Sequence, residues 1–188
     1  MRLKLSTFLL VSLVITVAVG SIAQGYFNQI AALERAELKS RLVDEIIQSF
    51  KDTGRSPAAD VQHVVDHAAS SERSVMFIDI CWSTTSKIGS YRFAEFIVEY
   101  QNAHPNDPVM FYYVDCPHGA NGYAPFRSLP GWKDLETDGQ SLICGNGELV
   151  WMHQGEVLRV EPIGRTQTNS ELIRMTDRLW LLGRDKRR

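Results

Sequence analysis

The chain has 188 residues, a formal net charge of −2 and 44% hydrophobic residues, a balance that is typical of a folded globular protein. A nucleic-acid-binding protein needs a basic surface that neutralises phosphates, and Lys+Arg 20 against Asp+Glu 22 gives no such surplus. Three cysteines without a C-x-x-C pair argue against a disulfide-rich miniprotein and a cysteine-clamped zinc site. The composition therefore favours one compact domain that does not bind nucleic acid.

The amino terminus, residues 1–25, is predicted to be a signal peptide or a membrane anchor. Its apolar part, residues 5–23, follows the basic residues Arg2 and Lys4. A helix of this length reaches about 28 Å, close to the hydrocarbon thickness of a bilayer, whereas small residues at 21–23 resemble a cleavage site. Both interpretations send the rest of the chain across the membrane. We expect an extracytoplasmic domain, membrane-anchored if the segment stays and secreted or periplasmic if it is cleaved.

Residues 26–57 are predicted to form an amphipathic helix and a linker. Apolar residues recur mostly three to five positions apart among charged ones, at Ile30, Leu33, Leu38, Leu42, Ile46 and Phe50. The helix could be a stalk, a pairing surface for a homodimer, or an element that folds back on the domain. The stripe is short for a coiled coil, which favours folding back. Gly54 and Pro57 end the helix, and we place the domain boundary there.

The domain is predicted to span residues 58–183, before a basic tail at 184–188. The expected elements are helix 60–69, strand 74–81, helix 87–103, strand 109–116, a Gly/Pro-rich stretch 117–132, strand 140–144, strand 149–152 and helix 170–182. The first two strands should pair in parallel through a helical crossover, and strand 140–144 should run antiparallel to the first. Asn146-Gly147 is the expected hairpin turn, and residues 157–160 could extend the hairpin beyond Gln154-Gly155. This order, βαβ then ββα with helices on both faces, defines an α/β domain.

Three short segments resemble the thioredoxin family. Trp82-Ser83-Thr84-Thr85-Ser86-Lys87 follows the first strand, where thioredoxins have Trp-Cys-Gly-Pro-Cys-Lys, while Glu99-Tyr100-Gln101 and Asn146-Gly147-Glu148 match a helix ending and a hairpin of the family. The resemblance covers residues 58–183 and implies a thioredoxin-like fold. Serine stands in place of both motif cysteines. Because thiol-disulfide exchange needs a thiolate, Ser83 and Ser86 cannot perform the family's usual reaction.

The chain departs from the thioredoxin pattern in three further places. Thioredoxins carry a cis-proline just before the third core strand, and counting back from the expected hairpin puts Gly139 or Gln140 there. Asp79 is a loose counterpart of the family's buried acidic residue, and Tyr91 lies near its helix-kinking proline. The resemblance thus implies a binding edge rather than an active site. Its residues are Trp82, Ser83, Thr84, Thr85, Ser86, Gly139 and Gln140, and the serines and threonines also suit the amino-terminal cap of a helix.

Cys81 and Cys116 support an alternative function. They end the two strands that we expect to pair, on the edge where open α/β sheets hold their sites, and neighbouring strands lie about 4.8 Å apart, within reach of a disulfide. The chain would then be a variant thiol-disulfide oxidoreductase that uses these two residues. The structural alternative makes both of them small buried hydrophobes or one bridge. Cys144 is expected in the core.

No metal, cofactor or phosphate site is expected. Cys116-Pro117-His118 with His63, His67 or His153 fits no metal-ligand spacing, and the glycines near residue 119 lack the lysine of a phosphate loop. Three aromatic residues of the same stretch could border the binding edge or fill the core, namely Tyr123, Phe126 and Trp132. We expect a protein or peptide partner, and membrane contact only through the amino-terminal segment.

Overall fold

A computed structural model describes residues 24, 27–50, 59–80, 83–116, 124–136, 142, 145–163 and 167–185. The predicted apolar segment 5–23 and the linker 51–58 lie outside these ranges. Within them, no helix has both the length and the apolar character that crossing a membrane requires. The chain divides into two compact units, Met1–Arg41 and Leu42–Arg188, and the second contains the sheet.

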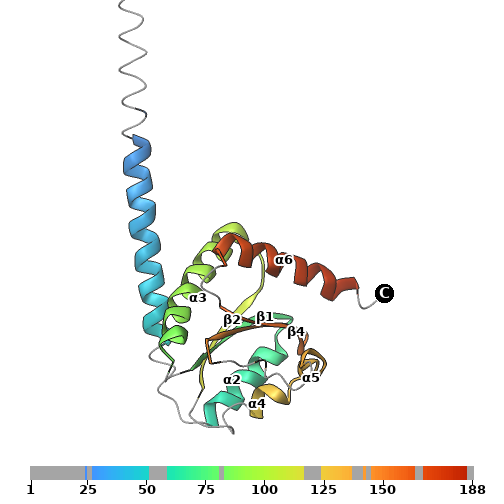
Figure 1. The fold of residues 1–188 in the computed structure, drawn as a ribbon. Coiled ribbons are helices and arrows are strands. Elements are labelled where there is room, and N and C mark those ends of the chain that lie inside the picture. The colour runs from blue at the N-terminus through green and yellow to red at the C-terminus, as the bar shows by residue number, and fades with distance from the viewer. Residues whose placement is uncertain are drawn as a thin grey trace, which may run out of the picture. The chain divides into compact units, whose positions relative to one another are not determined.

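The second unit is built on a four-stranded mixed sheet with the strand order β2-β1-β3-β4 (Figure 1). The strands are β1 (Arg73–Ile80), β2 (Met110–Cys116), β3 (Glu148–His153) and β4 (Glu156–Pro162). β1 runs parallel to β2 and antiparallel to β3, and β3 runs antiparallel to β4. The predicted parallel pairing of the first two strands is confirmed, and the domain is of the α/β type.

Helices cover both faces of this sheet (Figure 1). The helices are α2 (Ala59–Ser70), α3 (Thr84–Ala103), α4 (Ala124–Arg127), α5 (Trp132–Leu135) and α6 (Asn169–Asp185). Alternation along β1 divides its side chains between two cores: Met76, Ile78 and Ile80 pack with α2, α4 and α5, whereas Val75 and Phe77 pack with α3 and α6. The helices predicted at 60–69, 87–103 and 170–182 are confirmed.

Residues 27–50 are helical, and the last two turns of this helix belong to the unit Leu42–Arg188. Val43 and Ile47 are buried there against Ala94 and Val98 of α3. The ring of Phe50 stacks on that of Tyr113 in β2, with 4.4 Å between the ring centroids. Residues 42–50 therefore pack on the domain, while folding back of the whole helix and the homodimer stay predictions.

The predicted hairpin turn at Asn146-Gly147 is wrong. β3 begins directly after Gly147, and the hairpin that joins it to β4 turns at Gln154-Gly155. These two residues have φ angles of 50° and 81°, and positive φ at both central positions is the requirement of a type I′ turn. Asparagine adopts this conformation more readily than glutamine, so the sequence pattern favoured the wrong dipeptide.

The prediction that strand 140–144 pairs antiparallel with the first strand is also wrong. β1 has β2 on one side and β3 on the other, so its antiparallel neighbour is Glu148–His153 rather than residues 140–144. Leu142, the described residue of that segment, lies in a bend. The strand predicted at 149–152 is confirmed as β3, which begins one residue earlier, at Glu148.

Two of the three aromatic residues in the 117–132 stretch fill the core. Phe126 and Trp132 are buried in the cluster that faces α2, with their ring centroids 6.4 Å apart. They do not border an exposed edge, and Tyr123 lies outside the described residues.

A type I′ turn predicts that substitutions at Gly155 and at Gln154 change the free energy of unfolding differently. Gly155→Ala places a Cβ in the left-handed region and about 3.0 Å from the carbonyl oxygen of Ala69, so the free energy of unfolding should fall by about 1–2 kcal/mol. Gln154→Asn, the matched control, should leave it unchanged or raise it. Urea unfolding of both variants measures the difference. Equal losses in the two variants would argue against a type I′ turn here.

Candidate functional site

The candidate site begins where β1 ends and α3 starts. Ser83 is the N-cap of α3, with its Oγ accepting a hydrogen bond from the backbone N–H of Ser86 at 3.3 Å. The backbone N–H of Ser83 donates to the carbonyl of Ile80 at 2.8 Å, so the chain passes from strand to helix within three residues. Thr84 is exposed and Thr85 half-buried at this junction. The cap predicted from these residue types is present at Ser83.

The hydroxyl of Ser86 joins the end of the strand to the start of the helix. It is fully buried, accepts a hydrogen bond from the backbone N–H of Ile80 at 2.8 Å and donates one to Oδ1 of Asp79 at 2.5 Å. A hydroxyl can donate one hydrogen bond, and Ser86 donates its hydrogen bond to the Asp79 carboxylate. The Ser86 hydroxyl therefore has a structural role, because its hydrogen bonds link the start of α3 to the end of β1.

Asp79 is a buried carboxylate held by hydroxyls from two elements. It lies on the same face of β1 as Phe77 and is 7% exposed. Ser86 of α3 donates to one carboxylate oxygen, and the phenol of Tyr113 in β2 donates to the other. Hydrogen bonds to a charged acceptor are stronger than neutral ones, and these two offset part of the cost of removing Asp79 from water.

Gly147 precedes β3, on the opposite side of β1 from β2, and lies against Ser86 and Phe77. Its φ is 84°, and a Cβ at this position would lie 2.9 Å from Oγ of Ser86 and 2.8 Å from the ring of Phe77. A side chain would therefore collide with the strand-helix junction. The backbone N–H of Asn146 donates to the buried carboxylate of Glu148 at 3.2 Å, which fixes the entry into β3. Neither Gly147 nor Tyr113 was predicted as a residue of this site from the sequence.

A cavity of about 260 Å³ opens beside Asp79. It is lined by Ile47, Phe50, Asp79, Lys87, Ser90 and Tyr91. The first two residues belong to the helical segment 27–50, and the last three come from α3. The buried carboxylate is thus reachable from a partly apolar hollow next to the strand-helix junction.

The predicted site residues have different outcomes. The structure brings Ser83, Thr84, Thr85 and Ser86 together at one junction, beside Asp79. Cys116 is 1% exposed and belongs to the core that faces α2, on the opposite face of the sheet from Ser86 and α3. Four predicted site residues lie outside the described residues: Cys81, Trp82, Gly139 and Gln140. Cys144 lies outside them as well.

Metal ligands do not gather within the described parts of the chain. No group of three His, Cys, Asp or Glu side chains is placed there to hold a metal ion. The rings of His63 and His67 contact each other one turn apart on α2, with 4.5 Å between their centroids, but two imidazoles alone do not make such a group.

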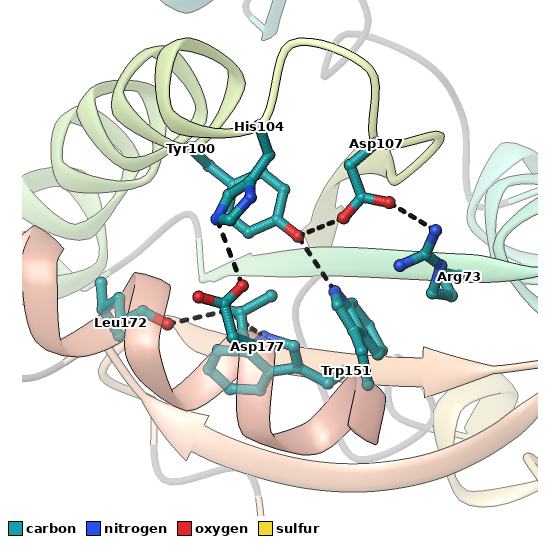
Figure 2. A network of polar contacts seen from close by, with 9 residues as sticks. Arg73, Tyr100, His104, Asp107, Trp151, Leu172 and Asp177 are labelled. Atoms are coloured by element: carbon teal, nitrogen blue, oxygen red, sulfur yellow. Dashed lines mark hydrogen bonds and ion pairs between the residues drawn. The ribbon is translucent and has the colours of Figure 1, made fainter. Parts of the chain in front are cut away.

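A second polar network lies at the other end of β1 (Figure 2). The phenol of Tyr100 donates to Asp107 at 2.7 Å and accepts a hydrogen bond from the indole N–H of Trp180 at 3.2 Å. Asp107 also forms an ion pair with Arg73, the first residue of β1. Burial and the neighbouring Asp107 carboxylate raise the pKa of Tyr100 well above its ordinary value. The network keeps its phenol protonated and ties α3, α6 and β1 together, which is a structural role.

No protein-family model matches the chain, and no curated protein is significantly similar to it. The functional interpretation therefore rests on the geometry of the site.

The different environments of the serines predict different costs of truncation. Ser86→Ala leaves the Ile80 N–H and the Asp79 carboxylate each short of a partner, so the free energy of unfolding should fall by about 2–3 kcal/mol. Ser83→Ala removes only a cap and should cost about 1 kcal/mol. Ser90→Ala is the control on the same helix, because within the described residues its hydroxyl bonds to the carbonyl of Lys87 alone, and it should change stability by less than about 0.5 kcal/mol. Urea unfolding measures all three, and equal losses at Ser83 and Ser86 would contradict the buried bridge.

Tyr100 predicts a loss of stability at alkaline pH. An unfolded tyrosine ionises near pH 10, whereas the folded state holds the proton to higher pH. The contribution of the protonated Tyr100 to the free energy of unfolding is therefore complete below about pH 10. It is lost as pH rises above that value, by at most about 1.4 kcal/mol per pH unit. Between pH 10 and 11.5 the free energy of unfolding should fall more steeply for the unchanged protein than for Tyr100→Phe. Parallel curves would show that Tyr100 does not retain its proton on folding.

Proposed function

We propose that residues 58–183 form a thioredoxin-like domain that binds a protein or peptide partner at the edge where β1 meets α3, without thiol-disulfide chemistry. The strand order β2-β1-β3-β4, with a parallel first pair and a closing hairpin and helix, supports the fold part of the proposal, because it is the order that the thioredoxin fold requires. An extracytoplasmic location belongs to the same proposal and is supported by the apolar run at residues 5–23.

The observed start of β3 at Glu148 also supports the resemblance to thioredoxins, through the position that precedes this strand. Thioredoxins hold a cis-proline just before the third core strand, against their redox motif. With β3 beginning at Glu148, the residue at that place is Gly147 rather than Gly139 or Gln140. Gly147 lies against Ser86, which occupies the position of the second motif cysteine. The hairpin at Gln154-Gly155-Glu156 then takes the place first given to Asn146-Gly147-Glu148.

The observation that carries the functional part is the internal hydrogen bonding of Ser86. Its hydroxyl donates to Asp79 and accepts from Ile80, so the residue that would be a cysteine in an oxidoreductase serves here to brace the junction. A serine hydroxyl neither ionises near neutral pH nor forms a disulfide. The junction is therefore suited to presenting a surface rather than to exchanging electrons.

An exposed face of α3 supplies that surface. Thr84, Ile88 and Tyr91 follow one another at helical spacing, and Ile88 and Tyr91 are 53% and 50% exposed. Large apolar side chains that gather on an exposed face beside a structured edge are typical of protein interaction sites. The partner is expected to cover this face of α3 and the strand-helix junction.

The alternative, an oxidoreductase that uses Cys81 and Cys116, has less support. A reactive cysteine must be accessible as the thiolate, and Cys116 is 1% exposed within a hydrophobic core. Ile80, rather than Cys81, is its partner in the β1–β2 register.

Restoring the cysteines tests the redox part of the proposal. The unchanged protein should not accelerate insulin reduction by dithiothreitol. Ser83→Cys/Ser86→Cys should form an internal disulfide, seen by mass spectrometry as the loss of two hydrogen atoms, and should gain reductase activity. Ser83→Cys alone is the control and should gain none. Activity of the unchanged protein that disappears in Cys81→Ser would support the oxidoreductase instead, and a double variant that forms no bridge would contradict a thioredoxin-like junction.

Site-specific crosslinking tests the binding part. A photoreactive phenylalanine analogue at Thr84 or Ile88, in the full chain in its own cells, should capture the same partner, because both residues lie on the proposed face. The analogue at Gln62, exposed on α2, is the control and should not capture it. Excess unlabelled protein should compete for the partner and the variant Ile88→Asp should not. Equal capture at all three positions would contradict the proposed edge.

A further inference from the structure

The cavity beside Asp79 has the chemistry of a pocket for one basic side chain. We infer that the partner inserts a lysine or arginine there, with its charged group on the Asp79 carboxylate. The inference rests on the proposed function, because the cavity adjoins the edge where the partner is expected, and it names the chemistry that the partner must carry.

The size of the cavity limits its occupant. Its volume is about 260 Å³, below the lower end of about 300 Å³ for sites that enclose a drug-sized molecule. A single long side chain fits such a space better than a cofactor. The cavity also lies at the surface between a helix end and α3, where a bound chain can reach it from outside.

The walls suit the stem of a long basic side chain. Ile47 and the rings of Phe50 and Tyr91 line the cavity, and lysine and arginine bury their methylene stems along apolar surface while the charged end seeks a polar partner. The aromatic faces also attract a cation directly. An acidic or short polar side chain would gain little from these walls.

The carboxylate of Asp79 provides the charge that selects a cation. A carboxylate has about four acceptor positions, and two neutral hydroxyls, those of Ser86 and Tyr113, occupy one each. The ion pairs within the described ranges involve other residues and not Asp79. A carboxylate on a residue that is only 7% exposed, without a counter-ion among the described residues, is costly, so an entering guanidinium or ammonium would lower that cost.

Among the described residues that line the cavity, Lys87 is the one that opposes a cation. Its side chain is exposed, so its ammonium is hydrated and its repulsion is weakened by water and salt. Asp79 is largely removed from water, where the same charges interact more strongly. The attraction of the buried carboxylate should therefore exceed the repulsion of the exposed lysine.

Small probes with one stem and different end groups test this inference on the full chain. We expect n-butylguanidinium to shift the backbone amide signals of Lys87, Ser90 and Tyr91 in a saturable NMR titration in the millimolar range. n-Butanol, with the same stem and no charge, should bind at least about ten-fold more weakly than n-butylguanidinium. Butyrate should not bind. All titrations are made at equal ionic strength.

Two matched variants separate the contributions of the two charges. Asp79→Asn keeps an acceptor for Ser86 and removes the charge, so it should weaken n-butylguanidinium binding about ten-fold. Lys87→Met removes the opposing charge from an exposed position, so it should preserve or strengthen binding. If Asp79→Asn does not fold, Lys87→Met still decides, because a site for anions would lose its binding in that variant.

Three results would overturn the inference: equal binding of n-butanol and n-butylguanidinium, binding of butyrate that Lys87→Met abolishes, or no saturable shift with n-butylguanidinium. These results are separate from the fate of the proposed function. If a partner crosslinks at Thr84 and Ile88 and the cation does not bind, the edge stands and the basic side chain is excluded. If the cation binds and nothing crosslinks at the edge, the proposed function fails while the pocket remains.

Discussion

A carboxylate removed from water at the end of a central strand is the constraint on which this domain depends. Asp79 is tolerable there only because hydroxyls from two other elements reach it, Ser86 from α3 and Tyr113 from β2. Each of these bonds fixes one element against the end of β1. The position of the helix start and the alignment of the neighbouring strand both follow from satisfying one buried charge.

The same constraint explains the role of serine at position 86. Serine at position 86 supplies a donor for Asp79 and an acceptor for the Ile80 N–H, and a thiol makes both kinds of hydrogen bond only weakly. Gly147 leaves room for the hydroxyl to sit against the entry of β3. The hydroxyl of Ser86 is therefore satisfied by Ile80 and Asp79, while Ile88 and Tyr91 of α3 stay exposed.

The sequence predicted β1, α3, β2 and β3 because apolar runs and helical spacing define these elements locally. It misplaced the antiparallel neighbour of β1 and the hairpin turn, because an apolar run does not show which strand it pairs with. The contacts of Asp79 could not be predicted, because Tyr113 reaches it only through the register of β1 against β2. The cavity depends on where residues 47–50 pack on α3; the amphipathic stripe favours folding back on the domain but does not show which surface it covers.

The burial of Val43 and Ile47 against α3 has a consequence for where the folding unit begins. A boundary at residues 53–57 separates these side chains from the surface that they cover. A fragment starting at residue 58 would present Ala94 and Val98 to water and would lack the Ile47 and Phe50 wall of the cavity. A truncated form used to study binding should therefore begin inside this helix, near Leu42, so that it retains Val43, Ile47 and Phe50.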